Sequence, residues 1–171
     1  MPRPLPPLDA DALYEKAVRS LAQRGRSESE LRRRLGPRAT TTAALDAALE
    51  RLRDHGYLDD ARLAHSAAAY QKEGLRHGRS RALRELQERG LAPALAVAAV
   101  EAAYVGENED ALLRAYAKKK RLRRPEELRQ VASLYRKLRL AGFSSAACQR
   151  CLRAWRIEPA WLERLEESAE E

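Results

Sequence analysis

The sequence has few of the residues from which β-strands and disulfide-linked scaffolds are built. Of its 171 residues only 5% are aromatic, two are cysteines, and Ile157 is the single isoleucine. Strands favour β-branched and aromatic residues, whereas the abundant Ala, Leu, Arg and Glu favour helices. We therefore predict an all-α protein, in which several small three-helix cores replace one deep core.

The sequence also lacks the apolar segments that direct a chain into a membrane. No stretch is long and apolar enough to span a bilayer, and the N-terminal residues include prolines instead of the apolar run of a signal peptide. No helical segment combines a strongly apolar face with the Trp and Phe residues of interfacial anchors. Two cysteines are too few for a disulfide framework at this length. We predict a cytoplasmic protein with no membrane partner.

Candidates for catalytic or metal-binding chemistry are few and isolated. His55, His65 and His77 share no helical spacing that would bring them together, and there is no glycine-rich phosphate loop. Cys148 and Cys151 form a lone CxxC without two further ligands at zinc-finger spacing. They lie on an apolar stripe, where buried thiols are expected. We predict no enzymatic activity, no cofactor and no metal.

The charge of the chain is strongly positive. The formal net charge is +8 and the sequence pI is near 9.9, which is above the value of about 9 that is typical of nucleic-acid-binding domains. The alternative is a basic protein with no such partner, whose many arginines reflect a GC-rich genome. Composition alone leaves both interpretations open.

The cations are concentrated in three clusters. Six of the seven residues at 118–124 are cationic. A single run of this kind is often only the solvated end of a helix, but three clusters favour a surface that meets phosphates or an acidic protein. Since no aromatic residues interleave them, we expect contact with the nucleic-acid backbone without base stacking or sequence readout. The candidate contact residues are Arg32, Arg33, Arg34, Arg76, Arg79, Arg81, Arg84, Lys118, Lys119, Lys120, Arg121, Arg123 and Arg124.

Glycine-containing joints separate the predicted helices. Gly56 can end one helix in the left-handed conformation, Asp59 can cap the next helix, and Asp60 adds negative charge at the positive end of that helix. Tyr57 and Leu58 are apolar and are expected to be buried between the two helices. The same arrangement recurs near residues 90 and 142. The residues predicted to form the joints are Gly56, Tyr57, Leu58, Asp59, Asp60, Gly90, Gly142 and Phe143.

Start signals define nine helical segments. Ser27 followed by Glu30 forms a capping-box pattern. Pro125 is expected to begin the eighth segment, because proline suits the first helical position. The other segments have start signals at Asp9, residues 40–42, Asp59, Ser80, Pro93, Asn108 and Ser144.

The nine segments fall into groups of three with a period of about 50 residues, which is typical of tandem helical repeats. We predict an elongated, curved array of three three-helix repeats at residues 9–56, 57–106 and 107–158. A flexible proline-rich leader at residues 1–8 precedes the repeats, and an acidic tail at residues 159–171 follows them.

The order and spacing of several motifs resemble the RecX family. The first motif is RGRSESELRRRL at residues 24–35, and the second is GYLDDARLA at residues 56–64. The resemblance extends roughly over residues 13–155. The segments that match the family's later repeats are residues 78–80 (GRS), 85–86 (EL), 89–91 (RGL) and 142–144 (GFS).

The resemblance implies three tandem three-helix repeats and a negative regulator of the RecA recombinase in homologous recombination and the SOS response. RecX-like proteins bind the groove of the RecA–DNA filament, suppress ATP hydrolysis and strand exchange, and favour filament loss. The implied partners are the RecA filament and, through the backbone, single- and double-stranded DNA; we expect a monomer. One departure is Ala92 and Pro93, which stand where a polar cap would be usual.

Two other classes of function remain open. Short helices with glycine turns can imitate helix-turn-helix units, so the chain could be a DNA-binding transcription regulator or bind DNA without sequence preference. It could also be a helical-repeat scaffold for protein interactions, with the positive charge incidental. A recognition helix aimed at base edges would favour the first class, and salt-independent or absent DNA affinity would favour the second.

Overall fold

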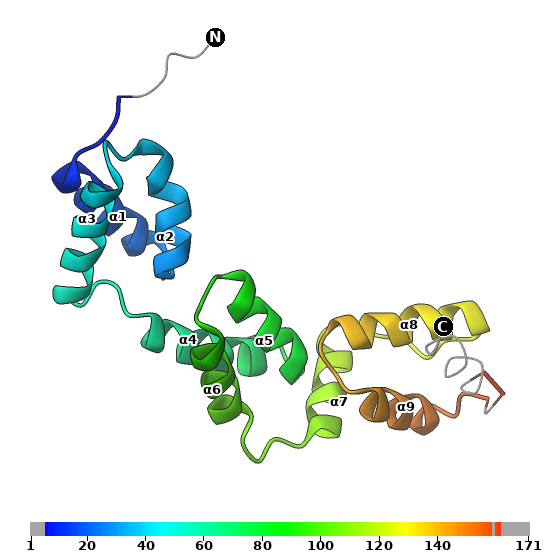
Figure 1. The fold of residues 1–171 in the computed structure, drawn as a ribbon. Coiled ribbons are helices and arrows are strands. Elements are labelled where there is room, and N and C mark those ends of the chain that lie inside the picture. Colours follow the sequence, from blue (N-terminus) through cyan, green and yellow to red (C-terminus); the bar gives the residue numbers. More distant parts are fainter. Residues whose placement is uncertain (1–5, 159, 162–171) are drawn as a thin grey trace, which may run out of the picture. The chain divides into compact units, whose positions relative to one another are not determined.

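The computed structural model describes residues 6–158 and 160–161, and every regular element in this part of the chain is a helix (Figure 1). The all-α prediction is confirmed. The helices are α1 (Ala10–Gln23), α2 (Glu28–Leu35), α3 (Thr42–Asp54), α4 (Asp60–Ala69), α5 (Arg79–Glu88), α6 (Pro93–Tyr104), α7 (Glu109–Lys119), α8 (Leu128–Leu140) and α9 (Ser145–Ala154), with a 3₁₀ turn, η1 (Gly36–Arg38), and a π-helical turn, η2 (Tyr70–Gly74).

Side-chain caps set most of the helix starts, as the sequence predicts. Asp9 accepts the N–H of Ala12, and Asn108 and Ser144 cap α7 and α9 in the same way. Ser27 and Glu30 form the complete capping box at the start of α2. Each cap satisfies a backbone N–H that has no partner inside the helix, which is worth about 1 kcal/mol.

The predicted start of the eighth helix at Pro125 is wrong. Helix α8 begins at Leu128, with Glu127 in the extended cap conformation. Pro125 is buried in the preceding connection, and the N–H of Glu126 donates to Gln130 Oε1 instead of entering the helix. Proline is compatible with a first helical position but does not require one, so the local signal was not sufficient. Helix α5 likewise begins one residue before the predicted Ser80, at Arg79.

The described chain divides into two compact units. Unit one comprises the residues up to Ser66 together with Glu85–Ala99, and unit two comprises Ala67–Arg84 together with the residues from Val100 onwards. Helices α4, α5 and α6 each contribute to both units. The three-repeat division at residues 9–56, 57–106 and 107–158 stays a prediction.

The core of unit one is built from the apolar stripes of α1, α2 and α3. Helices α1 and α3 pack together over their lengths, because their apolar residues recur at helical spacing. Each fully buried leucine contributes about 1.5–3 kcal/mol through loss of exposed apolar surface. The buried members of this core are Leu13, Ala17, Leu31, Leu35, Leu45, Ala48, Leu49, Leu52 and Leu58.

Helices α7, α8 and α9 form a second core within unit two. Phe143, which follows the glycine that ends α8, is fully buried, and its ring meets Tyr116 edge to face with centroids 5.5 Å apart. Leu138 of α8 and Leu152 of α9 are also completely buried. The apolar stripes predicted for α8 and α9 therefore face this core.

Leu8, the last residue of the predicted leader, is bonded to the backbone of unit one. Leu8 donates its N–H to Arg38 O at 2.7 Å and accepts from Thr40 N at 2.9 Å, which fixes it beside the connection from η1 to α3. Residues 1–5 of the leader, and Pro159 and residues 162–171 of the acidic tail, lie outside the described residues.

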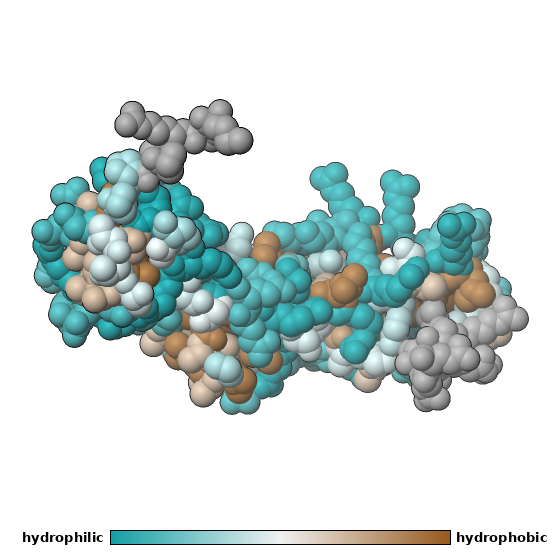
Figure 2. All heavy atoms as spheres, turned by 45° about the horizontal axis from the view of Figure 1, so that its top comes forward, coloured by the Kyte–Doolittle hydropathy of each residue, from teal (hydrophilic) through white to brown (hydrophobic). Residues whose placement is uncertain are grey.

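The visible surface is mostly polar. Figure 2 shows hydrophilic side chains over most of one face, with apolar side chains in small groups. Among the described helices, none is long and apolar enough to cross a membrane.

Candidate anion-binding surface

The joint glycines adopt the conformation that the sequence predicts. Gly56, Gly90 and Gly142 have φ values of +70°, +73° and +95°, a region that a side chain with a Cβ enters at a cost. Asp59 accepts the N–H of Arg62 at 2.8 Å and so caps α4. These residues end and begin helices at the predicted places.

The two apolar residues of the first joint behave differently from each other. Leu58 is buried in the core of unit one, but Tyr57 is 50% exposed. The expectation that Tyr57 is trapped between helices is therefore wrong. Its ring stands edge to face with His55, and His55 Nδ1 lies 2.7 Å from the hydroxyl of Tyr14. A single apolar residue in the joint is enough to anchor the turn.

Asp60 has a second role that local sequence did not suggest. Its Oδ1 accepts the N–H of Glu28 at 3.0 Å, so a carboxylate of α4 lies at the start of α2. Burial raises the pKa of Asp60, although the bond from Glu28 N–H acts in the opposite direction. The residue therefore joins two helices of unit one.

The end of α5 is held against the start of α2. The Ser27 hydroxyl donates to Arg89 O, and the Arg89 guanidinium donates to Gly25 O at 2.7 Å and to Glu30 Oε2 at 3.0 Å. Burial alone would raise the pKa of Glu30, but the bonds from Arg89 and Ser27 outweigh it and lower the pKa. Gly90, a predicted joint residue, lies close to Ser29 at this contact. The contact stabilises unit one.

The same relation recurs in unit two, where the end of α8 is held against the start of α5. Gly78 N donates to Ala141 O at 2.8 Å, and Ser80 N donates to Gly142 O at 3.3 Å. The guanidinium of Arg84 donates to Leu140 O at 2.9 Å. The C-terminal end of α5 thus contacts the start of α2, and the C-terminal end of α8 contacts the start of α5. Gly142, a predicted joint residue, takes part in the second contact through its carbonyl oxygen.

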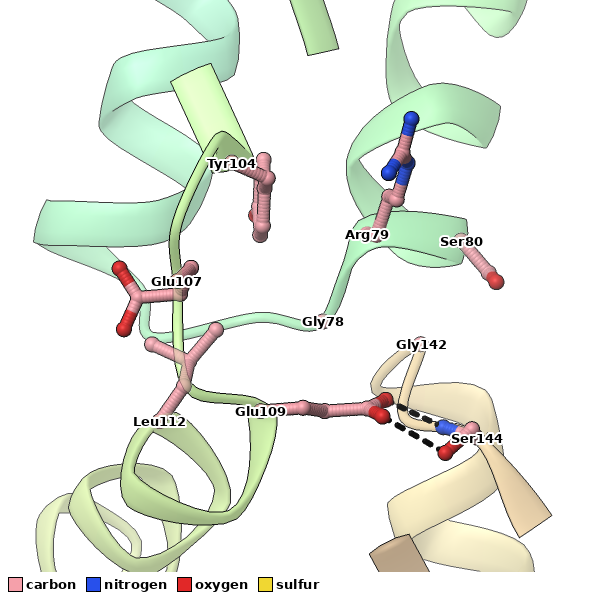
Figure 3. A pocket seen from close by; sticks show the side chains of 9 residues that line it. All are labelled: Gly78, Arg79, Ser80, Tyr104, Glu107, Glu109, Leu112, Gly142 and Ser144. Atoms are coloured by element: carbon pink, nitrogen blue, oxygen red, sulfur yellow. Dashed lines mark hydrogen bonds between the residues drawn. The ribbon is translucent and has the colours of Figure 1, made fainter. Parts of the chain in front are cut away.

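A hollow of about 310 Å³ lies beside this second contact. Figure 3 shows Glu109 reaching Ser144, whose N–H and hydroxyl both donate to the carboxylate, at 2.6 and 2.7 Å, while the Arg79 side chain points away. Arg79 instead pairs with Glu101 at 3.2 Å. The polar groups of this hollow are largely satisfied within the protein, so it is better explained as a joint than as a ligand site.

The first predicted cationic cluster is only partly free. Arg32 pairs with Glu28 of the preceding turn of α2 and with Asp46 of α3, whereas Arg33 and Arg34 are exposed. Neither of these two makes an ion pair with any described residue. Arg33 and Arg34 are the members of this cluster that can meet a partner.

The second cluster is divided between structural and exposed side chains. Arg84 fastens α8, and Arg79 pairs with Glu101. Arg76 is exposed and has a φ of +60°. Arg81 lines a separate hollow of unit two. These four residues are close together in the sequence, but the structure gives them different surroundings.

The third cluster continues past the end of α7. Lys118, Lys119, Arg121 and Arg123 are exposed and have no ion-pair partner within the described chain. Lys120 Nζ lies 6.0 Å from the centroid of the Tyr116 ring. The guanidinium of Arg124 donates to Arg156 O at 2.9 Å, so this last cation fastens the chain.

The separate hollow of unit two brings basic residues from distant segments together. Its volume is about 600 Å³. It joins Arg81 of the second cluster to Arg136 and Lys137 of α8, which the sequence reasoning missed. The signal was an Arg-Lys pair on the polar face of α8, opposite the stripe of Val131 and Leu138. The residues that line this hollow, called the basic hollow below, are His77, Arg81, Tyr116, Ser133, Arg136, Lys137, Leu140 and Ala141.

His77 is held in a fixed orientation at the basic hollow. Its Nδ1 lies 2.7 Å from Gln71 Oε1, and because an amide oxygen only accepts, Nδ1 carries the proton in this arrangement. Burial, and then the positive charges of Arg81 and Lys120, lowers the pKa of His77. Burial is the largest cause of the lowered pKa, and the two cations act in the same direction.

The cysteines have structural surroundings. Both are free thiols; Cys148 is buried in the core of unit two and Cys151 is half-buried. Burial raises the pKa of Cys148 to about 12 and also raises that of Cys151, so both remain protonated and weakly reactive. Within residues 6–158 and 160–161, no three His, Cys, Asp or Glu residues are grouped to hold a metal ion.

These features define a protein that is all-helical over its described residues and has exposed arginine and lysine clusters. No family model matches the chain. Regulatory protein RecX of Leptothrix cholodnii is 31% identical over 142 residues, which are 83% of this chain and 88% of that protein. The chain belongs to the RecX family of regulatory proteins.

Solved structures show the same fold. A crystal structure of regulatory protein RecX matches with a TM-score of 0.63 at 21% identity, over 82% of this chain and 70% of that one. RecX from Lactobacillus salivarius matches with a TM-score of 0.62 at 15% identity, over 86% of this chain and 97% of that one. The all-helical fold predicted from the sequence is therefore that of RecX structures.

Proposed function

We propose that the chain is a negative regulator of the RecA recombinase that binds the groove of the RecA–DNA filament. Membership of the RecX family supports this role. The single observation that carries it is that many of the predicted contact residues are exposed and have no ion-pair partner in the described chain, among them Arg33, Arg34, Arg76, Lys118, Lys119, Arg121 and Arg123. A surface of this kind attracts an acidic protein face or the phosphates of DNA.

The proposed mechanism is steric and electrostatic. The chain, acting as a cytoplasmic monomer, would lie in the groove and make the rearrangement of RecA subunits unfavourable. ATP hydrolysis, strand exchange and filament growth would all decrease. The chain itself would need no cofactor and catalyse no reaction, since the ATP is bound and hydrolysed by RecA.

Arginines that already hold the fold are less available for this contact. Arg32, Arg79, Arg84 and Arg124 each have a partner within the protein. Substituting them would disturb the fold and binding together. The exposed, unpaired cations are therefore the better positions at which to test the function.

The test is the DNA-dependent ATPase activity of RecA on single-stranded DNA. We expect substoichiometric amounts of the chain to suppress hydrolysis, because one molecule in a groove contacts several RecA subunits. The fold of the added protein is checked by its helical circular dichroism. Unchanged hydrolysis at every ratio, with folded protein, would refute the proposal.

A DNA-binding protein that does not act on RecA is the second candidate, and the basic hollow is the observation that favours it. Such a protein would bind oligonucleotides with a steep salt dependence and leave RecA hydrolysis unchanged. A protein-interaction scaffold would show neither effect. The two measurements together separate the three functions.

A further inference from the structure

We propose that the basic hollow of unit two is a phosphate-binding site that holds the backbone of a nucleic-acid strand. The hollow is formed by the segment before α5, by α5 itself, by α7 and by α8. This inference rests on the proposed function, because it names the ligand of one part of the same basic surface. It adds residues of α8 that no sequence cluster contained.

The basic hollow concentrates positive charge and hydrogen-bond donors. Arg81, Arg136 and Lys137 line the hollow, and Lys120 is close enough to influence His77. None of the residues that line the hollow carries a carboxylate, and Arg136 and Lys137 are exposed on α8. Guanidinium groups bind phosphate oxygens in pairs, and ammonium groups add point charges.

The backbone is strained at a residue directly beside the hollow. In the described chain, the residues other than glycine with positive φ are Arg76, Arg121 and Arg156. Arg76 directly precedes His77, and Arg121 directly follows Lys120. The left-handed conformation costs conformational energy for any residue with a side chain, whereas glycine adopts it freely. Such backbone strain is concentrated at functional sites.

Arg76, Arg121 and Arg156 each follow the end of a helical segment. His77 N donates to Gln71 O at 2.9 Å, and Leu122 N donates to Ala117 O at 2.9 Å. In both cases the bond closes the last helical turn around an arginine where glycine is the usual residue. Arg76 is therefore an exposed cation next to His77 of the hollow, and Arg121 is an exposed cation next to Lys120.

The shape of the positive surface favours a nucleic-acid strand over a small anion. Lys118, Lys119 and Arg123 extend the positive charge beyond the hollow, so the ligand is expected to be a polyanion longer than the hollow. Leu140, 65% exposed at the hollow, can contact the apolar face of a sugar. Tyr116 is buried, so bases are not expected to stack there.

The experiment measures the affinity of the full chain for a fluorescent thymidine oligonucleotide at several salt concentrations. We expect Arg136→Gln/Lys137→Gln to weaken binding about tenfold and to reduce the slope of log K against log salt by about 1.4, as for two lost contacts to a single strand. The control, Arg19→Gln/Arg153→Gln, removes the same charge at exposed positions that do not line the hollow and should weaken binding less than about threefold. Equal weakening by the two variants would overturn the proposal.

A second variant separates binding from folding. Arg121→Gly keeps the left-handed turn and removes the cation. We expect weaker oligonucleotide binding together with an equal or higher thermal unfolding midpoint. Unchanged oligonucleotide affinity would contradict the functional explanation of the strained arginines.

Competition identifies the ligand and separates this inference from the proposed function. Unlabelled oligonucleotide should displace the probe, whereas inorganic tripolyphosphate at equal phosphate concentration should compete weakly. If Arg136→Gln/Lys137→Gln lost affinity for oligoglutamate but kept it for DNA, the hollow would be an acidic-protein site and the inference would be wrong. Normal suppression of RecA hydrolysis with no oligonucleotide effect would refute only the inference.

Discussion

A single histidine links the basic surface to the stability of unit two. His77 donates to Gln71 from Nδ1, its ring centroid lies 5.9 Å from that of Tyr116, and its backbone carbonyl accepts the Tyr104 hydroxyl at 2.8 Å. The charged groups that act on it are Arg81 and Lys120. Protonating His77 would place another positive charge among these cations, at a position where burial already disfavours charge.

The direction of this shift predicts how stability depends on pH. The pKa of His77 is lowered in the folded state, so below the ordinary value of 6.5 the unfolded chain binds the proton more readily than the folded one. This contribution to stability is complete above pH 6.5, is lost as the pH falls towards the lowered pKa, and then levels off.

We expect His77→Asn to remove part of the decrease in the thermal unfolding midpoint between about pH 7.5 and 5.5. His65→Asn is the matched control, because His65 is exposed on α4. Thermal unfolding followed by circular dichroism at both pH values checks this. An identical pH dependence in wild type and His77→Asn would show that folding does not change the pKa of His77.

At the scale of helices, the glycines that end them serve two distinct purposes. Gly56 and Gly142 both require positive φ. A Cβ at Gly56 would meet nothing within 4 Å, whereas a Cβ at Gly142 would lie 2.7 Å from Gly78 O and closer still to Arg81 N. Gly56 therefore serves only the turn, and Gly142 also permits the close approach of α8 to α5.

This difference predicts unequal costs for the same substitution. Gly56→Ala should destabilise the protein by about 1–2 kcal/mol, which is the cost of the left-handed conformation. Gly142→Ala should cost more than about 3 kcal/mol, because backbone atoms must also move apart. Urea unfolding of the two variants measures the difference, and equal costs would show that the contact between α8 and α5 is not tight in solution.

Helix starts were predictable where one residue both caps and begins the turn. Ser27, Asn108 and Ser144 bond within three residues of themselves, so local sequence contains the whole interaction. Pro125 was a misleading start signal, because the helix start there depends on the bond from Glu126 N–H to the Gln130 side chain in the following residues. The prediction for Tyr57 failed because burial depends on the packing of distant segments: Leu58 is buried, whereas Tyr57 is half exposed.

At the scale of the molecule, the sequence identified the basic clusters but not their surroundings. Arg32 and Arg84 belong to clusters by sequence, yet each is held by a partner that lies elsewhere in the chain. The basic hollow unites Arg81 with Arg136 and Lys137 across more than fifty positions. Only tertiary structure supplies that proximity, so a charge run is a weak guide to a site when its neighbours in space are unknown.

Two matched double variants test whether the clusters have separate partners. Arg33→Gln/Arg34→Gln changes unit one, and Lys118→Gln/Lys119→Gln changes unit two; each lowers the formal net charge from +8 to +6. Both pairs are exposed, so folding should be preserved. Any difference between them must come from position and not from total charge.

We expect the unit-two pair to weaken oligonucleotide binding and flatten its salt dependence, because Lys118 and Lys119 extend the charge of the basic hollow. The unit-one pair should leave oligonucleotide affinity within about threefold of wild type and raise the protein concentration needed to suppress RecA hydrolysis. DNA affinity and RecA ATPase activity, measured on the same preparations, give the comparison. If both pairs weakened both activities to the same extent, the cations would act as one diffuse field, and the division of partners between the two units would be wrong.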